Sequence, residues 1–167
     1  MPSTRSRRSA GILLHRGDAT ALEVLLVHPG GPAWSGRDVG AWSIPKGEYL
    51  DGEDPLLAAR REFQEELGTA PPDSEAADLG EIRQKSGKRV RGWALQGDLD
   101  VTQIQSNTFE FEWPPRSGKR IEIPEVDRAG WFDLPAAREK INPGQVPLLD
   151  RLEQLLLAPP GDLYRVE

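Results

Sequence analysis

Residues 47–69 read GEYLDGEDPLLAARREFQEELGT and contain the clearest helix signal in the chain. Asp54 is a suitable N-cap, Pro55 fits the first helical position, and Gly68 can close the end. The apolar positions recur at spacings of three, four and four residues, so they share one face: Leu56, Ala59, Phe63 and Leu67. The segment therefore predicts an amphipathic helix over residues 54–67.

The same helix carries three glutamates, Glu62, Glu65 and Glu66, at relative positions i, i+3 and i+4. At about 100° per residue, they fall within a sector of about 100°. Crowded carboxylates repel one another, and a bound cation relieves that repulsion. Their hard oxygen ligands favour Mg²⁺ or Mn²⁺. The ordinary alternative is a solvated acidic face on which Arg61 pairs with Glu65 across one turn.

Apolar runs on both sides of this helix predict strands. The runs 10–15 and 22–28 are joined by a short polar segment and predict a hairpin, which a loop over 29–40 follows. Further strands are expected at 79–83, 88–95, 108–113 and 131–132, and a closing helix at 146–157. The strand at 108–113 alternates polar and aromatic residues, as a half-buried strand does. Strands before and after one strong helix predict a mixed α/β layer architecture.

Length and composition bound the class of protein. The chain has 167 residues, which fits one domain over 9–158, with a flexible basic tail at 1–8 and a C-terminal tail at 159–167. Cysteine is absent, which excludes a disulfide framework and a thiol nucleophile and fits a reducing, cytoplasmic location. The formal net charge of −6 argues against duplex nucleic acid as a partner. No apolar run approaches the length of a membrane span.

The helix and the residues before it resemble the motif of the Nudix hydrolase family, G-x5-E-x7-R-E-U-x-E-E-x-G-U, in which U is an apolar residue. The matching residues stand at the required spacing: Gly47, Glu53, Arg61, Glu62, Phe63, Glu65, Glu66 and Gly68. Only Thr69 departs, where the family has an aliphatic residue, and this position concerns packing. The resemblance implies one Nudix-type domain, an α/β/α sandwich with a mixed sheet.

The resemblance also implies a role for each matched polar residue. Divalent ions would be held by the backbone carbonyl of one glycine and by the three helical carboxylates: Gly47, Glu62, Glu65 and Glu66. Glu62 or a neighbouring carboxylate such as Glu65 would also orient the attacking water. Arg61 would anchor the helix and hold a carboxylate in place, and Glu53 would brace the junction between loop and helix. Such proteins cleave a nucleoside diphosphate linked to another group, by water attack on phosphorus.

Residues just before the motif bear on the substrate. The run Trp42–Gly47, with the pattern W-x-x-P-K-G, resembles Nudix members that act on dinucleoside polyphosphates, and also some that act on capped RNA or nucleotides. Lys46 would supply a point charge to a polyphosphate chain. The basic tract 83–91 adds Arg89 and Arg91 as candidate substrate-binding residues. This tract and a second basic patch at 116–120 also fit solvated strand edges.

Family members often take a further metal-binding or base carboxylate from outside the motif. Glu110 and Glu112 share one face of the strand expected at 108–113. We take Glu112 as the candidate metal ligand, with Glu110 beside it and Glu125 behind both. A solvent-facing strand edge is the alternative for each of them.

Several other side chains have ordinary roles as the first interpretation. Trp34, Tyr49 and Trp113 are candidates to stack a base, although core or loop packing is the commoner role of such rings. His15 and His28 stand at the ends of predicted strands, where surface or capping roles are expected.

Together, these observations predict a Mg²⁺- or Mn²⁺-dependent pyrophosphohydrolase whose leading substrates are dinucleoside polyphosphates of the diadenosine tetraphosphate type. The alternatives are nucleoside triphosphates, sugar nucleotides and diphosphoinositol polyphosphates, or a non-catalytic Nudix module that senses a nucleotide. The intact R-E-x-x-E-E argues against the last of these. The expected partner is a small nucleotide or polyphosphate, and a homodimer is one of the assemblies left open.

Overall fold

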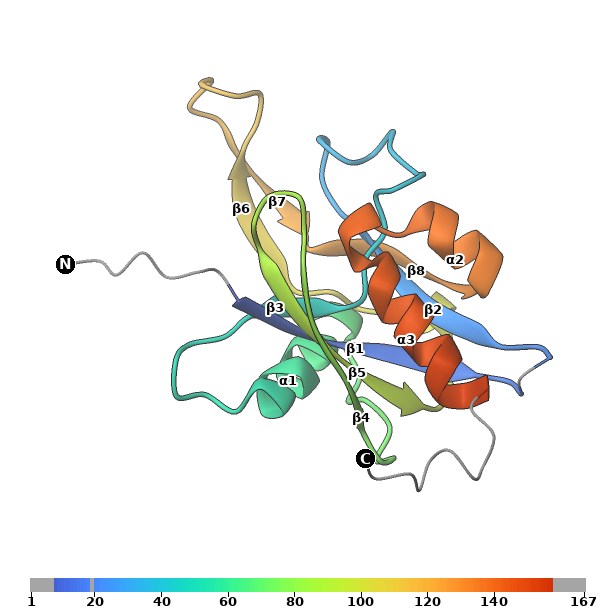
Figure 1. Cartoon of the computed structure of the whole chain (residues 1–167). Coiled ribbons are helices and arrows are strands. Elements are labelled where there is room, and N and C mark those ends of the chain that lie inside the picture. The colour runs from blue at the N-terminus through green and yellow to red at the C-terminus, as the bar shows by residue number, and fades with distance from the viewer. Residues whose placement is uncertain (1–7, 19, 158–167) are drawn as a thin grey trace.

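The computed structural model describes residues 8–18 and 20–157 (Figure 1). Its strands are β1 (Arg8–Arg16), β2 (Glu23–Pro29), β3 (Lys46–Glu48), β4 (Ala77–Arg83), β5 (Arg89–Gln96), β6 (Thr108–Glu112), β7 (Arg120–Pro124) and β8 (Val126–Asp133). Its helices are α1 (Pro55–Leu67), α2 (Leu134–Lys140) and α3 (Val146–Leu157), with short 3₁₀ turns at Val101–Gln103 and Pro143–Gln145. The two predicted tails lie outside the described residues, apart from Arg8, which begins β1.

The main sheet is mixed and has the strand order β4-β5-β1-β2-β8. β1 runs parallel to β5 from Arg8 to His15, whereas β2 is antiparallel to both β1 and β8. The predicted hairpin is present, because β1 pairs with β2, and the strands expected at 79–83 and 88–95 form a second hairpin in which β4 pairs with β5 through the turn at Ser86–Gly87. The prediction of a mixed α/β architecture is therefore confirmed.

Both faces of the sheet are covered by helices. Side chains alternate along β1, so Ile12 and Leu14 pack with α1 while Leu13 packs on the other face with α2 and α3. On the α1 side, Phe63 is fully buried, and on the other side Leu148 is equally buried. The chain thus forms an α/β/α sandwich with a separate apolar cluster on each face of the sheet.

α1 begins and ends where the sequence predicts. The Asp54 side chain accepts a hydrogen bond from the Leu56 backbone N–H at 2.9 Å, and Pro55 is the first helical residue. At the other end, Gly68 has a φ of 79°, in the left-handed region that glycine adopts without strain, and its N–H donates to the Gln64 carbonyl at 2.8 Å. These caps fix the ends of the helix that carries the three glutamates of the motif.

β3 takes the place beside β1 that β2 leaves free. β3 pairs with the first half of β1, whereas β2 pairs with only the last two residues of β1, His15 and Arg16. Between these two pairings, the Ile12 N–H donates to the Pro45 carbonyl at 3.1 Å. The divergence of β1 and β2 therefore makes room for the segment that brings Lys46 and Gly47 to α1.

Residues 108–113 differ from the expected half-buried strand. Within the described residues, β6 pairs with β7 alone, and the two form a hairpin apart from the main sheet. Figure 1 shows this hairpin projecting from the body of the molecule. Phe109 is 42% exposed, and Glu110 and Glu112 are exposed as well. The alternation of polar and aromatic residues along β6 therefore marks a row of aromatic side chains on a projecting hairpin. It does not mark a half-buried strand, because the main sheet covers neither face of β6.

Both histidines are buried, which contradicts the expected surface or capping roles. His28, near the end of β2, has no exposed surface. Its Nδ1 lies 2.9 Å from Oδ1 of Asp127, and its Nε2 lies 2.6 Å from the Arg37 carbonyl oxygen. A buried imidazole needs such partners, and the chain supplies them from β8 and from the loop after β2.

The helices of the described residues are short, with 13, 7 and 12 residues. α2 was not indicated by the sequence pattern, because seven residues make only about two turns and show little apolar repeat. None of the described helices combines the length and the apolar character that crossing a bilayer requires.

Phe63→Ala tests the packing of α1 against the sheet. Emptying this fully buried position should lower the free energy of unfolding by about 3–5 kcal/mol. Leu57→Ala on the same helix is the matched control, because Leu57 is 64% exposed and its loss should change stability by less than about 0.5 kcal/mol. Urea denaturation of both variants measures the difference, and equal destabilisation would contradict this packing.

Candidate active site

Three carboxylates from two parts of the chain meet where β3 approaches α1. One oxygen from each of Glu62, Glu66 and Glu125 lies within 4.8 Å of the others. Glu62 and Glu66 are one turn apart on α1, and Glu125 is the single residue between β7 and β8. We call these three residues the carboxylate cluster.

Asn107 links Glu125 to the C-terminal turn of α1. Its side-chain amide donates to a carboxylate oxygen of Glu125 at 3.3 Å, and its backbone carbonyl accepts from the Glu125 N–H at 3.0 Å. The Asn107 N–H in turn donates to the Glu65 carbonyl at 2.9 Å. Asn107 therefore ties a carboxylate that is 59 positions further along the chain to the helix that carries Glu66.

β3 completes the cluster from the sheet side. The Lys46 backbone N–H donates to Oε2 of Glu66 at 3.1 Å. At Gly47, a Cβ atom would lie 2.0 Å from the carboxyl carbon of Glu62, so this position has no space for any side chain while Glu62 keeps its place. The motif glycine thus permits the close approach of β3 to α1.

The cluster is short of positive charge. The pKa of Glu66 is raised to about 8, chiefly by burial; the nearby Glu125 and Glu62 contribute to the rise, and Lys46 opposes it. Burial also raises the pKa of Glu62, and Glu65 adds to this effect. In turn, burial and Lys88 lower the pKa of Lys46. Three converging carboxylates with oxygen donors are the set that a hard divalent cation fits, and such a cation would remove the repulsion among them.

Arg61 lies beside the carboxylates of α1 and contacts the loop before this helix. Its guanidinium pairs with Glu53, and it also lies 3.3 Å from a carboxylate oxygen of Glu62 and 3.9 Å from one of Glu65. Glu53 in turn accepts from the Leu50 N–H at 3.2 Å. Arg61 and Glu53 therefore connect the loop before α1 to Glu62 without joining the carboxylate cluster themselves.

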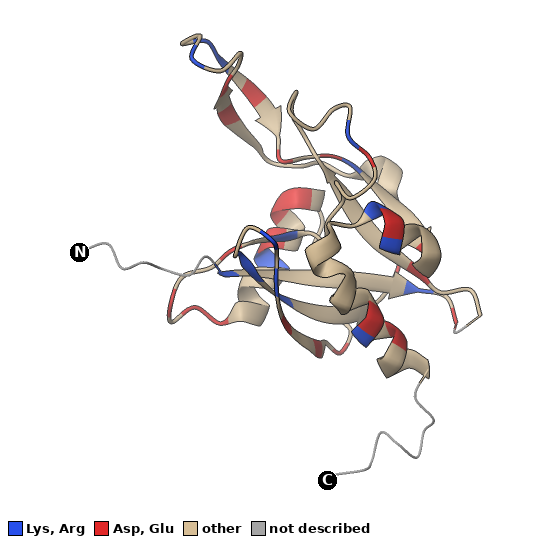
Figure 2. Cartoon of the chain, turned by 45° about the horizontal axis from the view of Figure 1, so that its top comes forward, with Lys and Arg blue, Asp and Glu red and all other residues tan. Residues whose placement is uncertain are grey.

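The carboxylate cluster opens into a cleft of about 810 Å³, here called the carboxylate cleft. Its wall includes the three carboxylates, Glu65, Lys46, Gly47 and Lys88, together with the aromatic rings of Trp34 and Phe109. Figure 2 shows the acidic turns of α1 and the basic residues around the β4–β5 turn, and of these basic residues Lys88 contributes to this wall. Acidic, basic and aromatic groups thus face one space.

Some of the residues selected from the sequence lie elsewhere. Glu112 is not part of the carboxylate cluster, and its carboxylate accepts from the Arg116 N–H at 3.1 Å within the β6–β7 hairpin. Arg89 lies 3.7 Å from Glu81, and Arg91 binds Asp78 at 2.5 Å. Glu125 and Lys88 occupy the places in the cleft that Glu112 and the two arginines were expected to take.

Glu125 was ranked behind the residues of β6 because the sequence pattern does not reveal where the hairpin ends. Glu125 follows β7 directly, and the signal that could have pointed to it is its position between two strands, where a side chain can face a helix end. Lys88 lies in the predicted basic tract. Its position at the cleft follows from the turn at Ser86–Gly87, which the basic composition of the tract does not reveal.

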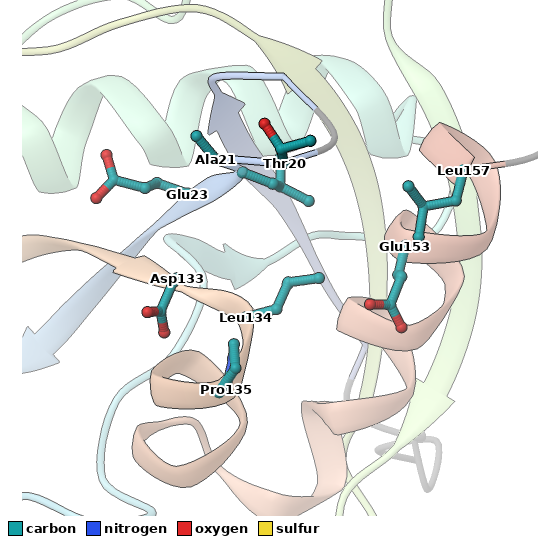
Figure 3. A pocket seen from close by; sticks show the side chains of 9 residues that line it. Thr20, Ala21, Glu23, Asp133, Leu134, Pro135, Glu153 and Leu157 are labelled. Carbon is teal, nitrogen blue, oxygen red and sulfur yellow. The ribbon is translucent and has the colours of Figure 1, made fainter.

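A second cleft, of about 540 Å³, lies where the β1–β2 turn meets α2 and α3 (Figure 3). Its three acidic side chains already have partners. Glu23 binds Arg16 at 2.9 Å, Asp133 caps α2 through the Ala136 N–H at 2.9 Å, and Glu153 binds Arg138 at 2.8 Å. These engagements are structural, so this cleft offers no comparable set of free carboxylates.

Comparison with known proteins identifies the family. The family model described as NUDIX domain matches residues 5–152. The chain therefore belongs to the NUDIX domain family, and the resemblance drawn from Gly47–Thr69 is confirmed at that level.

Curated relatives match the chain over part of their own length. The chain is 39% identical over 107 residues to a nucleoside triphosphate pyrophosphatase/Nudix hydrolase fusion protein of Bifidobacterium longum, which covers 64% of the chain and 19% of that protein. It is 31% identical to an octanoyltransferase of Myxococcus xanthus over 61% of the chain and 25% of that protein. An RNA pyrophosphohydrolase of Caulobacter vibrioides is 30% identical over 62% of the chain and 73% of its own length. The chain thus spans a quarter or less of the first two relatives.

Solved structures share the fold. An Ap4A hydrolase of C. elegans, in a binary complex, superposes with a TM-score of 0.62 at 23% identity, over 89% of this chain and 97% of that one. The NUDIX domain of Shewanella oneidensis NrtR, complexed with ADP ribose, gives a TM-score of 0.58 at 16% identity, over 92% of this chain and 90% of that one. At these identities, the likeness concerns the fold alone.

Addition of Mg²⁺ should stabilise the protein through the carboxylate cluster. At a Mg²⁺ concentration of about a hundred times Kd, binding to the folded state adds about 2.7 kcal/mol to the free energy of unfolding. The melting temperature should therefore rise by roughly 5 °C or more. Glu125→Gln should lose most of this rise because it removes one cluster carboxylate. Glu112→Gln is the matched control and should keep the rise. Thermal melts with and without Mg²⁺ measure the shift, and the reverse order of the two variants would favour Glu112 as the ligand.

Proposed function

We propose that the chain is a divalent-metal-dependent pyrophosphohydrolase that cleaves a nucleoside diphosphate linked to another group. Dinucleoside polyphosphates of the diadenosine tetraphosphate type are the leading substrate class. The observation that carries this proposal is the carboxylate cluster, with oxygens within 4.8 Å of one another, in the same cleft as Lys46 and Lys88. Phosphoryl transfer needs carboxylates that hold a cation and ammonium groups that bind the phosphates, and the cleft has both.

Mg²⁺ or Mn²⁺ suits the donor set. Glu62, Glu66 and Glu125 would hold the cation, and Gly47 and Glu65 lie beside them on the cleft wall. Within the cluster there is neither sulfur nor imidazole, so the set favours hard cations over zinc. When bound, the cation would neutralise phosphate charge and activate water.

The chain's own residues would position the other reactants. Lys46 would place its ammonium on the polyphosphate, while its backbone N–H holds Glu66 at 3.1 Å. Arg61 would keep Glu62 oriented through the contact of 3.3 Å, with Glu53 fixing the guanidinium from the other side. Glu65 is partly exposed at the cleft wall, and it or Glu62 would accept a proton from the attacking water.

A second substrate class has support from a relative. The RNA pyrophosphohydrolase of Caulobacter vibrioides is 30% identical to the chain, so a pyrophosphate group carried by RNA is a candidate substrate alongside dinucleoside polyphosphates. Nucleoside triphosphates, sugar nucleotides and diphosphoinositol polyphosphates complete the proposed set. A small-molecule substrate and a cytoplasmic location form part of the same proposal, and a homodimer is a proposed assembly.

A substrate panel in Mg²⁺ and in Mn²⁺, with products identified by mass, tests the proposal. Wild-type protein should turn over at least one of these anhydrides, and Glu66→Gln should reduce that turnover by about two orders of magnitude or more because a metal ligand is lost. The apo form of Glu66→Gln should melt no lower than wild type, since a neutral amide replaces a carboxyl whose pKa burial raises to about 8.

Glu112→Gln is again the control, and its turnover should match wild type. The absence of metal-dependent turnover across the whole panel would overturn the enzyme proposal and favour a nucleotide-sensing module. Near-normal turnover by Glu66→Gln would overturn its assignment as a metal ligand.

A further inference from the structure

Two members of the carboxylate cluster are held by donors that the Nudix motif and the residue before it supply. The Lys46 backbone N–H donates to Oε2 of Glu66 at 3.1 Å, and a guanidinium nitrogen of Arg61 donates to Oε1 of Glu62 at 3.3 Å. The third member, Glu125, lies outside the motif, and its carboxylate faces two others that repel it. A donor from another part of the chain is therefore needed to keep Glu125 in the cluster.

Asn107 supplies that donor. Its side-chain Nδ2 donates to Oε1 of Glu125 at 3.3 Å, and among the described residues this amide is the one donor within hydrogen-bond distance of the Glu125 carboxylate. An asparagine amide is neutral, so it orients a carboxylate without adding a positive charge that would compete with a bound cation. Without it, repulsion from the other two carboxylates would turn the Glu125 side chain out of the cluster.

The backbone of Asn107 fixes the place of its amide. Its N–H donates to the Glu65 carbonyl of α1 at 2.9 Å, and its carbonyl accepts from the Glu125 N–H at 3.0 Å. These contacts close the base of the projecting β6–β7 hairpin, because Asn107 precedes β6 and Glu125 follows β7 (Figure 1). One residue thus holds both the main chain and the side chain of Glu125, and is itself tied to the helix that carries the other two carboxylates.

The other end of the Asn107 amide separates this contact from an ordinary structural role. Its Oδ1 is buried and has no hydrogen-bond partner among the described residues. A buried acceptor without a partner lowers stability, so an asparagine that served structure alone would be expected to have both ends of its amide satisfied. The opposite orientation of the amide would place Oδ1 against the Glu125 carboxylate, where two acceptors repel. The side chain of Asn107 is thus engaged through Glu125 alone.

We propose that Asn107 is a positioning residue of the cation site, although it is not itself a ligand. Its amide keeps the Glu125 carboxylate directed toward Glu62 and Glu66, so that the three oxygens are in place before a cation binds. A ligand that is already oriented loses less freedom on binding, and an outer hydrogen bond of this kind raises the affinity of the site for the metal. The proposal rests on the proposed function only in taking the carboxylate cluster as the cation site, and it does not depend on hydrolysis.

The affinity for Mn²⁺ tests this role without turnover, because the electron paramagnetic resonance signal of free Mn²⁺ falls as the ion binds. Asn107→Leu removes both ends of the amide at nearly constant volume and should raise Kd for Mn²⁺ roughly 10- to 100-fold. The substitution also removes the unpartnered Oδ1 and lets Glu125 move away from the other carboxylates, so the apo protein should melt at or above the temperature of wild type. A structural role would instead lower the melting temperature.

Ser106→Ala is the matched control at the same base of the hairpin. The Ser106 hydroxyl donates to the Asn107 carbonyl at 2.8 Å and accepts from the Val126 N–H at 3.0 Å, but it does not bind the Glu125 carboxylate. Its loss should lower the melting temperature by roughly 2–4 °C and change Kd for Mn²⁺ by less than about twofold. The two variants should therefore affect stability and metal affinity in opposite ways.

A crystal structure of metal-free Asn107→Leu gives a second measurement. It should show the Glu125 carboxylate turned away from Glu62 and Glu66, with the backbone contacts of residue 107 unchanged. A Glu125 side chain that keeps its place in this variant would overturn the proposal, because the amide would then not be what holds it.

The outcomes distinguish the role of Asn107 from the proposed function. Equal Mn²⁺ affinity of wild type and Asn107→Leu would overturn the positioning role and leave the proposed function standing. Equal weakening by Ser106→Ala would also overturn it, since the packing of the junction would then set the affinity. No binding of Mn²⁺ by wild type would overturn it together with the cation site. The expected pattern, in a protein that hydrolyses no member of the substrate panel, would support the positioning role and refute only the enzymatic activity.

Discussion

The mutual repulsion of Glu62, Glu66 and Glu125 is the constraint on which the rest of the site depends. Their oxygens approach within 4.8 Å of one another in a partly buried place, and burial raises the pKa of Glu66 to about 8. Such a cluster would separate if its backbone were free to move. It is held because α1 is capped at both ends and packed through Phe63, and because Gly47 lets β3 approach. The stability of the sandwich thus offsets the cost of assembling the charges.

The two ends of the cleft are built from different kinds of structure. The charged end stands on α1 and β3, which belong to the packed sandwich, so the carboxylates have little freedom. The aromatic end, which holds Trp34 and Phe109, stands on the loop after β2 and on the β6–β7 hairpin, which lies apart from the main sheet. His28 ties the loop after β2 to the main sheet, since it contacts both Asp127 on β8 and the Arg37 carbonyl in the loop. A packed framework that holds one set of side chains, combined with loops that present another, is how one fold can serve many functions.

Features of the site that depend on local pattern could be predicted from the sequence, and those that depend on distant contacts could not. The helical period alone places Glu62, Glu65 and Glu66 on one side of α1, and Asp54 and Gly68 mark its ends. The third member of the cluster is different, because Glu125 reaches α1 only through the register of β7 and the Asn107 contacts. Glu112 lies in an alternating pattern that is typical of a strand, so the sequence favoured it as a ligand. In the described part of the chain, however, its strand pairs only with β7, in a hairpin apart from the main sheet. Likewise, strand pairing directs Arg89 and Arg91 toward Glu81 and Asp78, and leaves Lys88 at the cleft.

The central claim is that the carboxylate cluster holds a divalent cation, and anomalous scattering tests it most directly. Crystals grown or soaked with Mn²⁺ should show a peak in the anomalous difference map among the carboxylates of Glu62, Glu66 and Glu125. Manganese–oxygen distances close to those of other hard divalent ions, roughly 2.0–2.3 Å, would identify these side chains as ligands. The absence of a peak at millimolar Mn²⁺, or a peak only at other carboxylates such as Glu112, would contradict the account.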